Sequence, residues 1–112
     1  MNTRKQVIFG QLGRLKPEMI GQYEALHANP WPEVLNTIHE CNLRNYSIFR
    51  HEDLVFAYFE YIGDDYDADM EKMAQDEATQ RWWTYTKPCF IPFSICPDSE
   101  FYADMKHIFY FA

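Results

Sequence analysis

The middle of the chain contains two stretches with the apolar density of buried strands. Residues 43–51 and 54–62 are apolar or aromatic at odd and even positions alike, most clearly in the VFAYF run at 55–59. A strand with one solvated face instead alternates apolar and polar residues. We therefore predict two strands that are joined by a short turn at 52–53 and covered on both faces.

Helical signals mark four other segments. Pro17 and Pro32 suit the first position of a helix, where a missing backbone N–H does no harm. Asp76 suits the position just before a helix, where its carboxylate can accept hydrogen bonds from free backbone N–H groups. The spacing of apolar residues then predicts helices over 17–29, 32–41, 67–75 and 77–86.

Weaker signals complete the order of elements. A Val-Ile-Phe run predicts a first strand at 6–12, followed by a turn at 13–16, and a last strand is expected at 105–111. Prolines make 87–100 a loop. The resulting order, β-α-α-β-β-α-α-β, is typical of an α+β fold of the ferredoxin-like, split βαβ type, in which an antiparallel sheet carries its helices on one face.

The other face of this sheet is apolar as well, and the predicted helices cannot cover it. A large exposed apolar surface is unusual in a monomeric protein and marks an interaction surface. We therefore expect a second copy to pack sheet on sheet, so that a homodimer resembles a closed barrel.

Composition limits the size, the partners and the compartment. The 112 residues suit one domain, spanning 1–112, and 47% of them are hydrophobic, which is enough for a packed core. The net charge of -7 argues against binding to nucleic acid or to an anionic membrane, and no apolar stretch is long enough to span one. Three cysteines without a C-x-x-C spacing are expected to be free thiols, as in a cytoplasmic protein.

The most informative chemistry lies at 23–31, where the sequence is YEALHANPW. Tyr23 and His27 are four residues apart, so on a helix they lie one turn apart on the same side, and Trp31 follows four residues later. Imidazole is the side chain that exchanges protons near neutral pH. A hydroxyl group beside aromatic rings is a suitable binding surface for a sugar. A lone histidine at the edge of a core is more often structural, so the interpretation depends on other residues nearby.

Three further aromatic residues are candidates for the same pocket. Trp82 and Trp83 are adjacent on the last predicted helix, where neighbours point about 100° apart and can equally serve packing. An exposed indole would provide a platform for the C–H face of a sugar ring. Tyr46 lies opposite in parity to Asn45 and Ser47 on its strand, so either Tyr46 or these two residues face the pocket.

No motif for a metal ion or a cofactor is present in the sequence. The four histidines have no H-x-x-H or H-E-x-x-H spacing, and no cysteine pair accompanies them. The four glycines are not clustered as in a phosphate-binding loop. The acidic run at 64–71 is typical of a solvated turn and helix start. We expect neither a metal nor a cofactor.

Three motifs, in the right order, resemble the L-rhamnose mutarotase family. They are Y-x-x-x-H followed by N-P and W-P-E, then N-Y on a strand, then Q-R-W-W-x-Y on a late helix, and the similarity extends from Lys5 to Phe111. The resemblance implies a dimeric α+β barrel with a monosaccharide substrate. It also implies that His27 is the proton donor and that Tyr23, Tyr46, Trp82 and Trp83 bind the sugar, to which the spacing adds Trp31 as an aromatic wall.

The resemblance leaves the sugar less defined than the reaction. The segment between His27 and Trp31 and the loop at 88–100 depart from the family pattern, and some relatives resemble L-fucose mutarotases. We predict a mutarotase for a 6-deoxy-L-sugar, L-rhamnose first and L-fucose next, in which His27 and Tyr23 move protons during ring opening and closure. The alternatives are a small dimeric α+β barrel monooxygenase or haem-binding protein, and a non-catalytic sugar-binding or dimerisation module, because a fold alone does not define a function.

Overall fold

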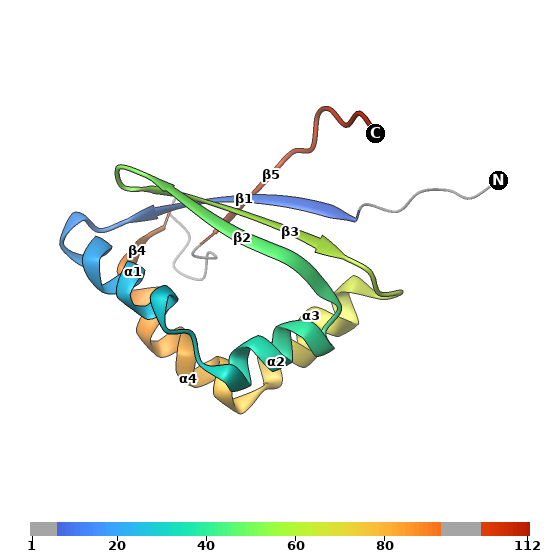
Figure 1. Ribbon diagram of the computed structural model, residues 1–112, viewed down its shortest axis with the longest axis horizontal. Coiled ribbons are helices and arrows are strands. Elements are labelled where there is room, and N and C mark those ends of the chain that lie inside the picture. The colour runs from blue at the N-terminus through green and yellow to red at the C-terminus, as the bar shows by residue number, and fades with distance from the viewer. Residues whose placement is uncertain (1–6, 93–101) are drawn as a thin grey trace.

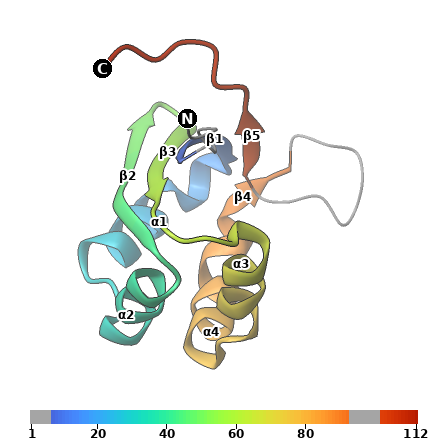
Figure 2. The same cartoon turned by 90° about the vertical axis from the view of Figure 1, so that its right-hand side faces the viewer.

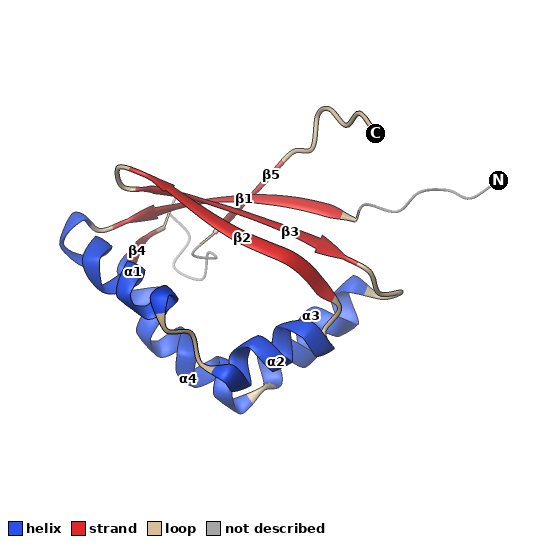
Figure 3. Cartoon of the chain, in the orientation of Figure 1, coloured by secondary structure: helices blue, strands red, loops and turns tan. Residues whose placement is uncertain are grey.

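The helices form one layer and the strands form the other. The computed structural model describes residues 7–92 and 102–112. Figures 1 and 3 show a twisted sheet with all the labelled helices on one side of it. In the described residues the strands are β1 (Ile8–Leu15), β2 (Leu43–His51), β3 (Leu54–Tyr61), β4 (Phe90–Ile91) and β5 (Ala103–Met105); the helices are α1 (Ile20–Ala28), α2 (Pro32–Glu40), α3 (Tyr66–Gln75) and α4 (Glu77–Thr86), with short 3-10 turns at Pro17–Met19 and Lys87–Cys89.

The sheet is antiparallel, with β3 and β1 at its centre. The strand order is β2-β3-β1-β4, and β5 also pairs with β1. In the register Phe49 lies opposite Phe56, and Phe56 lies opposite Leu12. Within the described residues β2 is therefore an edge strand with one unpaired side.

Side-chain caps start α3 and α4 where the sequence predicts helices. The Asp76 carboxylate accepts hydrogen bonds from the Thr79 backbone N–H at 2.9 Å and from the Thr79 hydroxyl at 2.8 Å. The Asp65 carboxylate caps α3 by accepting from the backbone N–H of Ala68. These bonds satisfy N–H groups that have no partner within the helix, and they confirm the predicted helix at 77–86.

The first strand is longer than predicted. The sequence predicts a turn at 13–16, but β1 continues to Leu15. Gly13 pairs with Val55 of β3 inside the strand, and the Phe90 ring packs so closely against it that a Cβ at Gly13 would lie 2.5 Å from Phe90 Cε2. A glycine within a strand often marks such a close approach, and the distant Phe90 gives no local signal of it.

The prediction of a last strand at 105–111 was wrong. Pairing with β1 covers only Ala103–Met105, and residues 106–112 leave the sheet on the side away from the helices (Figures 1 and 2). A strand needs a partner for its backbone groups as well as β-forming residues. Within this chain, the described residues supply none beyond Met105.

The core lies between the sheet and the helices. Odd-numbered residues of β3 are buried and even-numbered ones are half-buried, so the strand alternates in burial although its sequence does not. One buried cluster contains Leu15, Tyr23, Val55, Cys89 and Phe90, and a second contains Leu43, Phe59 and Tyr61. Met70 and Met73 of α3 pack against the second cluster.

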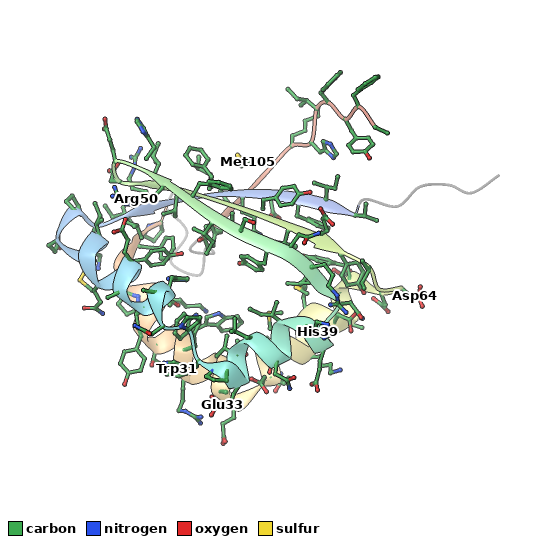
Figure 4. The ribbon with its side chains drawn as sticks, in the orientation of Figure 1. Trp31, Glu33, His39, Arg50, Asp64 and Met105 are labelled. Carbon is green, nitrogen blue, oxygen red and sulfur yellow. The ribbon has the colours of Figure 1, made fainter. Side chains whose placement is uncertain are left out.

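The face of the sheet away from the helices, here called the outer face, is uncovered. Phe49 on β2 is 64% exposed. Met105, also partly exposed, projects from this face in Figure 4. As expected from the sequence, this chain has no element over the outer face among its described residues, and cover of that face by a second copy stays a prediction.

Candidate active site

Helix α1 places Tyr23 and His27 side by side, as predicted. Their ring centroids are 4.3 Å apart, and the Tyr23 backbone carbonyl lies 2.8 Å from Nδ1 of His27. A carbonyl oxygen can only accept, so Nδ1 carries the proton in this hydrogen bond. In the neutral ring Nε2 is then the unprotonated nitrogen, which is free to accept a proton from a ligand.

Two tryptophans complete the surroundings of this histidine. The Trp82 ring meets the His27 ring edge to face, with centroids 5.4 Å apart. Trp31, which caps the start of α2, meets Trp82 in the same way at 5.2 Å. Figure 4 shows Trp31 in the helix layer, where α2 and α4 lie together. Helices α1, α2 and α4 thus each contribute to one aromatic cluster around His27.

Tyr46 faces the helices from β2. It lies within the register shift between Arg44 and Ser47, where the preceding Asn45 has a positive φ of 54°. The Tyr46 ring stacks on the inward-facing Phe59 with centroids 5.2 Å apart. Tyr46 is nevertheless 38% exposed, so solvent reaches this inward-facing side chain. The sequence left open whether Tyr46 or its neighbours face inward, and the bulge turns Tyr46 inward.

A third hydroxyl group, from Tyr102, joins the site and was not predicted. Tyr102 lies just before β5, and its hydroxyl is 2.7 Å from the hydroxyl of Tyr23. Its ring also contacts Phe90, with centroids 5.1 Å apart. The two tyrosines are 79 residues apart in sequence, so no local spacing could have connected them.

Burial keeps these phenols neutral. It raises the pKa values of Tyr23, Tyr46 and Tyr102 well above the ordinary value of 10.0, because the charged phenolate loses water contacts. The phenol of Tyr102 further raises the pKa of Tyr46. The site therefore offers neutral hydroxyl groups beside an imidazole.

Trp83 lies in a different environment from Trp82. It lines a shallow groove of about 570 Å³ on α4, together with Gln80, Thr84, Lys87 and Pro88. The Lys87 ammonium lies over its ring, 4.6 Å from the centroid. Adjacent helical residues point in different directions, so the structure brings Trp82 to His27 and places Trp83 in this groove. Its predicted role in sugar binding stays a prediction.

The described residues hold no group of three or more His, Cys, Asp or Glu side chains that could hold a metal ion. Cys41 and Cys89 are buried free thiols whose pKa values are raised by burial, while Cys96 lies outside the described residues. Among the described helices none has the length and apolar character needed to cross a membrane.

Fold and site together define a class of protein. The chain is an α+β protein with a ferredoxin-like arrangement, whose helix layer presents the His27 imidazole among hydroxyl and indole groups. Among the described residues, the contacts around His27 are made by phenol and indole groups, which suit an uncharged, polyhydroxylated ligand.

Solved structures support the fold. The L-rhamnose mutarotase FA22100 from Formosa agariphila superimposes with a TM-score of 0.75 at 21% identity, over 96% of this chain and 100% of that one. The tetracenomycin F2 cyclase from Streptomyces glaucescens, a type-II polyketide cyclase, superimposes with a TM-score of 0.64 at 18% identity and the same coverage. These likenesses confirm the predicted α+β fold.

Sequence comparison identifies the family. The family model described as L-rhamnose mutarotase matches residues 9–111. The L-rhamnose mutarotase of Listeria monocytogenes serovar 1/2a is 37% identical over 93 residues, which cover 81% of this chain and 85% of that protein. This chain belongs to the L-rhamnose mutarotase family, as the motifs predicted, and it is therefore a sugar mutarotase, an isomerase.

Proposed function

We propose that this protein interconverts the α and β anomers of L-rhamnose, with L-fucose as the next candidate, and that His27 transfers the protons. The observation that carries the proposal is the hydrogen bond from Nδ1 of His27 to the Tyr23 carbonyl, because it leaves Nε2 free for the sugar. Family membership supports the reaction, and the related protein of Listeria monocytogenes carries the name L-rhamnose mutarotase.

The proposed reaction moves one proton between two oxygens of the sugar. Nε2 of His27 takes the proton of the anomeric hydroxyl, the bond between C1 and the ring oxygen breaks, and the protonated imidazole returns the proton to the former ring oxygen. The open-chain aldehyde then rotates about its bond to C2. The same steps in reverse close the ring on the other face of the carbonyl, and no atom or electron is left over.

The aromatic and hydroxyl groups hold the sugar during this exchange. Trp82 and Trp31 flank His27 and provide apolar surface for the C–H groups of the ring and for the methyl group of a 6-deoxy sugar. Tyr23 and Tyr46, which are neutral phenols, donate hydrogen bonds to sugar oxygens. Binding by neutral groups agrees with a neutral substrate.

The active assembly is a homodimer that uses the outer face. Phe49 and the C-terminal residues Ile108, Phe109 and Phe111 are 64%, 83%, 78% and 86% exposed, more apolar surface than a monomer usually leaves in water. A second copy packed on the outer face would cover these side chains, and the tail would find backbone partners that the described residues of its own chain do not give it. The buried free thiols of Cys41 and Cys89 suit a reducing compartment such as the cytoplasm.

Dimerisation is tested by sedimentation equilibrium of the wild-type protein and two variants. Phe49→Glu places a charge on the outer face and is expected to give a monomer. Leu35→Glu, at a 49% exposed position on α2, is the matched control and should remain dimeric. A wild-type monomer, or a Phe49→Glu variant that is as dimeric as the control, contradicts this part of the proposal.

The enzyme activity is tested by NMR saturation transfer between the α and β anomeric proton signals of L-rhamnose and L-fucose. We expect the wild-type protein to accelerate exchange, with L-rhamnose favoured. His27→Ala should abolish acceleration while saturable sugar binding survives, and His39→Ala, at an exposed histidine of α2, should match the wild type. Full activity in His27→Ala removes this histidine from the mechanism. Saturable binding without any wild-type acceleration would instead indicate a sugar-binding module.

A further inference from the structure

The hydroxyl pair of Tyr23 and Tyr102 joins the two layers at the candidate active site. Tyr23 comes from α1 in the helix layer, and Tyr102 directly precedes β5 at the sheet. Their hydroxyl oxygens are 2.7 Å apart, a normal distance for an O–H···O hydrogen bond. Tyr23 in turn is the residue whose backbone carbonyl holds the His27 ring.

Packing fixes both rings of this pair. The Tyr23 ring is 4% exposed and meets the Phe90 ring edge to face at 5.3 Å. The Tyr102 ring contacts the same Phe90 at 5.1 Å. The residue after Tyr102 is Ala103, which pairs with Leu12 of β1 and so fixes the backbone beside it. Neither hydroxyl can therefore move far from the other without disturbing the core.

The chemistry of two neutral phenols determines what such a pair can do. Each hydroxyl has one proton to donate and two lone pairs that accept. When Tyr102 donates to the Tyr23 oxygen, the Tyr23 proton is released for another acceptor. Accepting one hydrogen bond also makes a hydroxyl a stronger donor of the next one. Burial, which raises the pKa values of both groups, keeps both protons in place.

We propose that Tyr102 is a positioning residue for the reaction: its hydroxyl donates to the Tyr23 oxygen and thereby directs the Tyr23 proton toward one of the two sugar oxygens between which His27 moves a proton. This inference rests on the proposed mutarotase function. It adds to the site a group from the C-terminal part of the chain, so that β5 and α1 must both be in place for catalysis.

The test is a double-mutant cycle of Tyr23→Phe, Tyr102→Phe and the variant carrying both changes. Each substitution keeps the ring and its contacts with Phe90 and removes only the hydroxyl. Anomer exchange of L-rhamnose is measured by saturation transfer as a function of sugar concentration, so that kcat and KM are obtained separately. Tyr61→Phe is the control, because it removes another buried phenol hydroxyl, bonded to Asp69, at the second core cluster.

We expect Tyr102→Phe to lower kcat by roughly threefold to tenfold, the effect of one neutral hydrogen bond, with a smaller change in KM. In a Tyr23→Phe background, where no Tyr23 proton remains to be directed, it should have no further effect. Additive losses in the double variant, an unchanged kcat in Tyr102→Phe, or an equal loss in Tyr61→Phe each overturn the inference.

A second measurement needs no substitution at either position. In wild-type protein labelled with carbon-13 at the tyrosine Cζ atoms, L-rhamnose should shift the signals of Tyr23 and Tyr102 together, because the hydroxyls form one chain. A shift of the Tyr23 signal alone contradicts the proposal. Failure of the two proposals is distinguishable: an inactive wild type overturns the proposed function, whereas an active wild type with an equally active Tyr102→Phe variant overturns only the role of Tyr102.

Discussion

Gly13 is a position where one added methyl group should have a large effect on the fold. A Cβ there would lie 2.5 Å from Cε2 of Phe90 and 3.1 Å from Cγ2 of Val55. Neither neighbour has room to move, because Phe90 is 3% exposed and Val55 is fully buried. Phe90 also holds the rings of Tyr23 and Tyr102, so the clash reaches the candidate active site.

The size of the effect follows from the contact distance. Carbon atoms in favourable contact are about 3.5–4.0 Å apart, so Gly13→Ala requires the Phe90 ring to move by roughly 1 Å. Overpacking of this kind destabilises a core by about 1–3 kcal/mol. For a domain of 112 residues, about 2 kcal/mol corresponds to a fall in Tm of roughly 8 °C.

Gly21→Ala is the matched control, since it makes the same chemical change with the opposite expected sign. Gly21 lies within α1, and a Cβ there would meet nothing within 4 Å. Alanine is favoured over glycine inside a helix by about 0.5–1 kcal/mol. We therefore expect Gly21→Ala to raise Tm and Gly13→Ala to lower it.

The assay is unfolding by heat and by urea, followed by circular dichroism at one protein concentration. Sugar exchange is measured at 20 °C or below, where both variants are folded. Gly13→Ala should lose activity even there because Phe90 holds Tyr23, whereas Gly21→Ala should not. A Gly13→Ala protein as stable as the wild type would show that the Phe90 ring can yield, and it would refute the packing argument.

Three other predictions concern single side chains. Asp76→Ala removes the cap of α4 and should lower the free energy of unfolding by about 1 kcal/mol. Asp76→Asn should keep most of the wild-type stability, and urea titrations of both variants measure the difference. Hydrogen bonds from Tyr61 and Asn42 hold the pKa of Asp69 below its ordinary 3.8. Its carboxylate therefore stabilises the fold above that pH and loses this effect as pH falls through the lowered pKa. Asp69→Asn should thus be less stable than the wild type at pH 7, and the difference in stability should become smaller below about pH 4. A difference between the two urea midpoints that stays the same at every pH contradicts this prediction. Trp82→Phe should raise KM for L-rhamnose by roughly two- to tenfold, since it reduces the aromatic surface beside His27; an unchanged KM would remove Trp82 from the sugar contacts.

Local signals in the sequence were enough for the helices and for one part of the site. Pro32 and Asp76 favour a helix start through their own backbone angle or through hydrogen bonds to residues close in sequence. The helices that they start lie where they were predicted. Tyr23 and His27 lie one turn apart on α1 because the helical repeat brings residues four apart together. The motifs also identified the family, since three of them occur in order along the chain.

Contacts between distant segments decided the rest. Pairing with Val55 of β3 makes Gly13 part of a strand instead of a turn, and the end of pairing with β1 stops β5 at Met105. Packing of α4 against its neighbours sends Trp82 to His27 and leaves Trp83 in a separate groove.

Tyr102 is the clearest case of a residue that no local pattern could assign to the site. Its partner Tyr23 is 79 residues earlier in the chain. Periodicity, caps and spacing report interactions over one or two turns of a helix or across a short turn. A hydrogen bond between a helix and a segment at the sheet edge exists only once both layers have packed, so the hydroxyl pair beside His27 is a property of the folded chain.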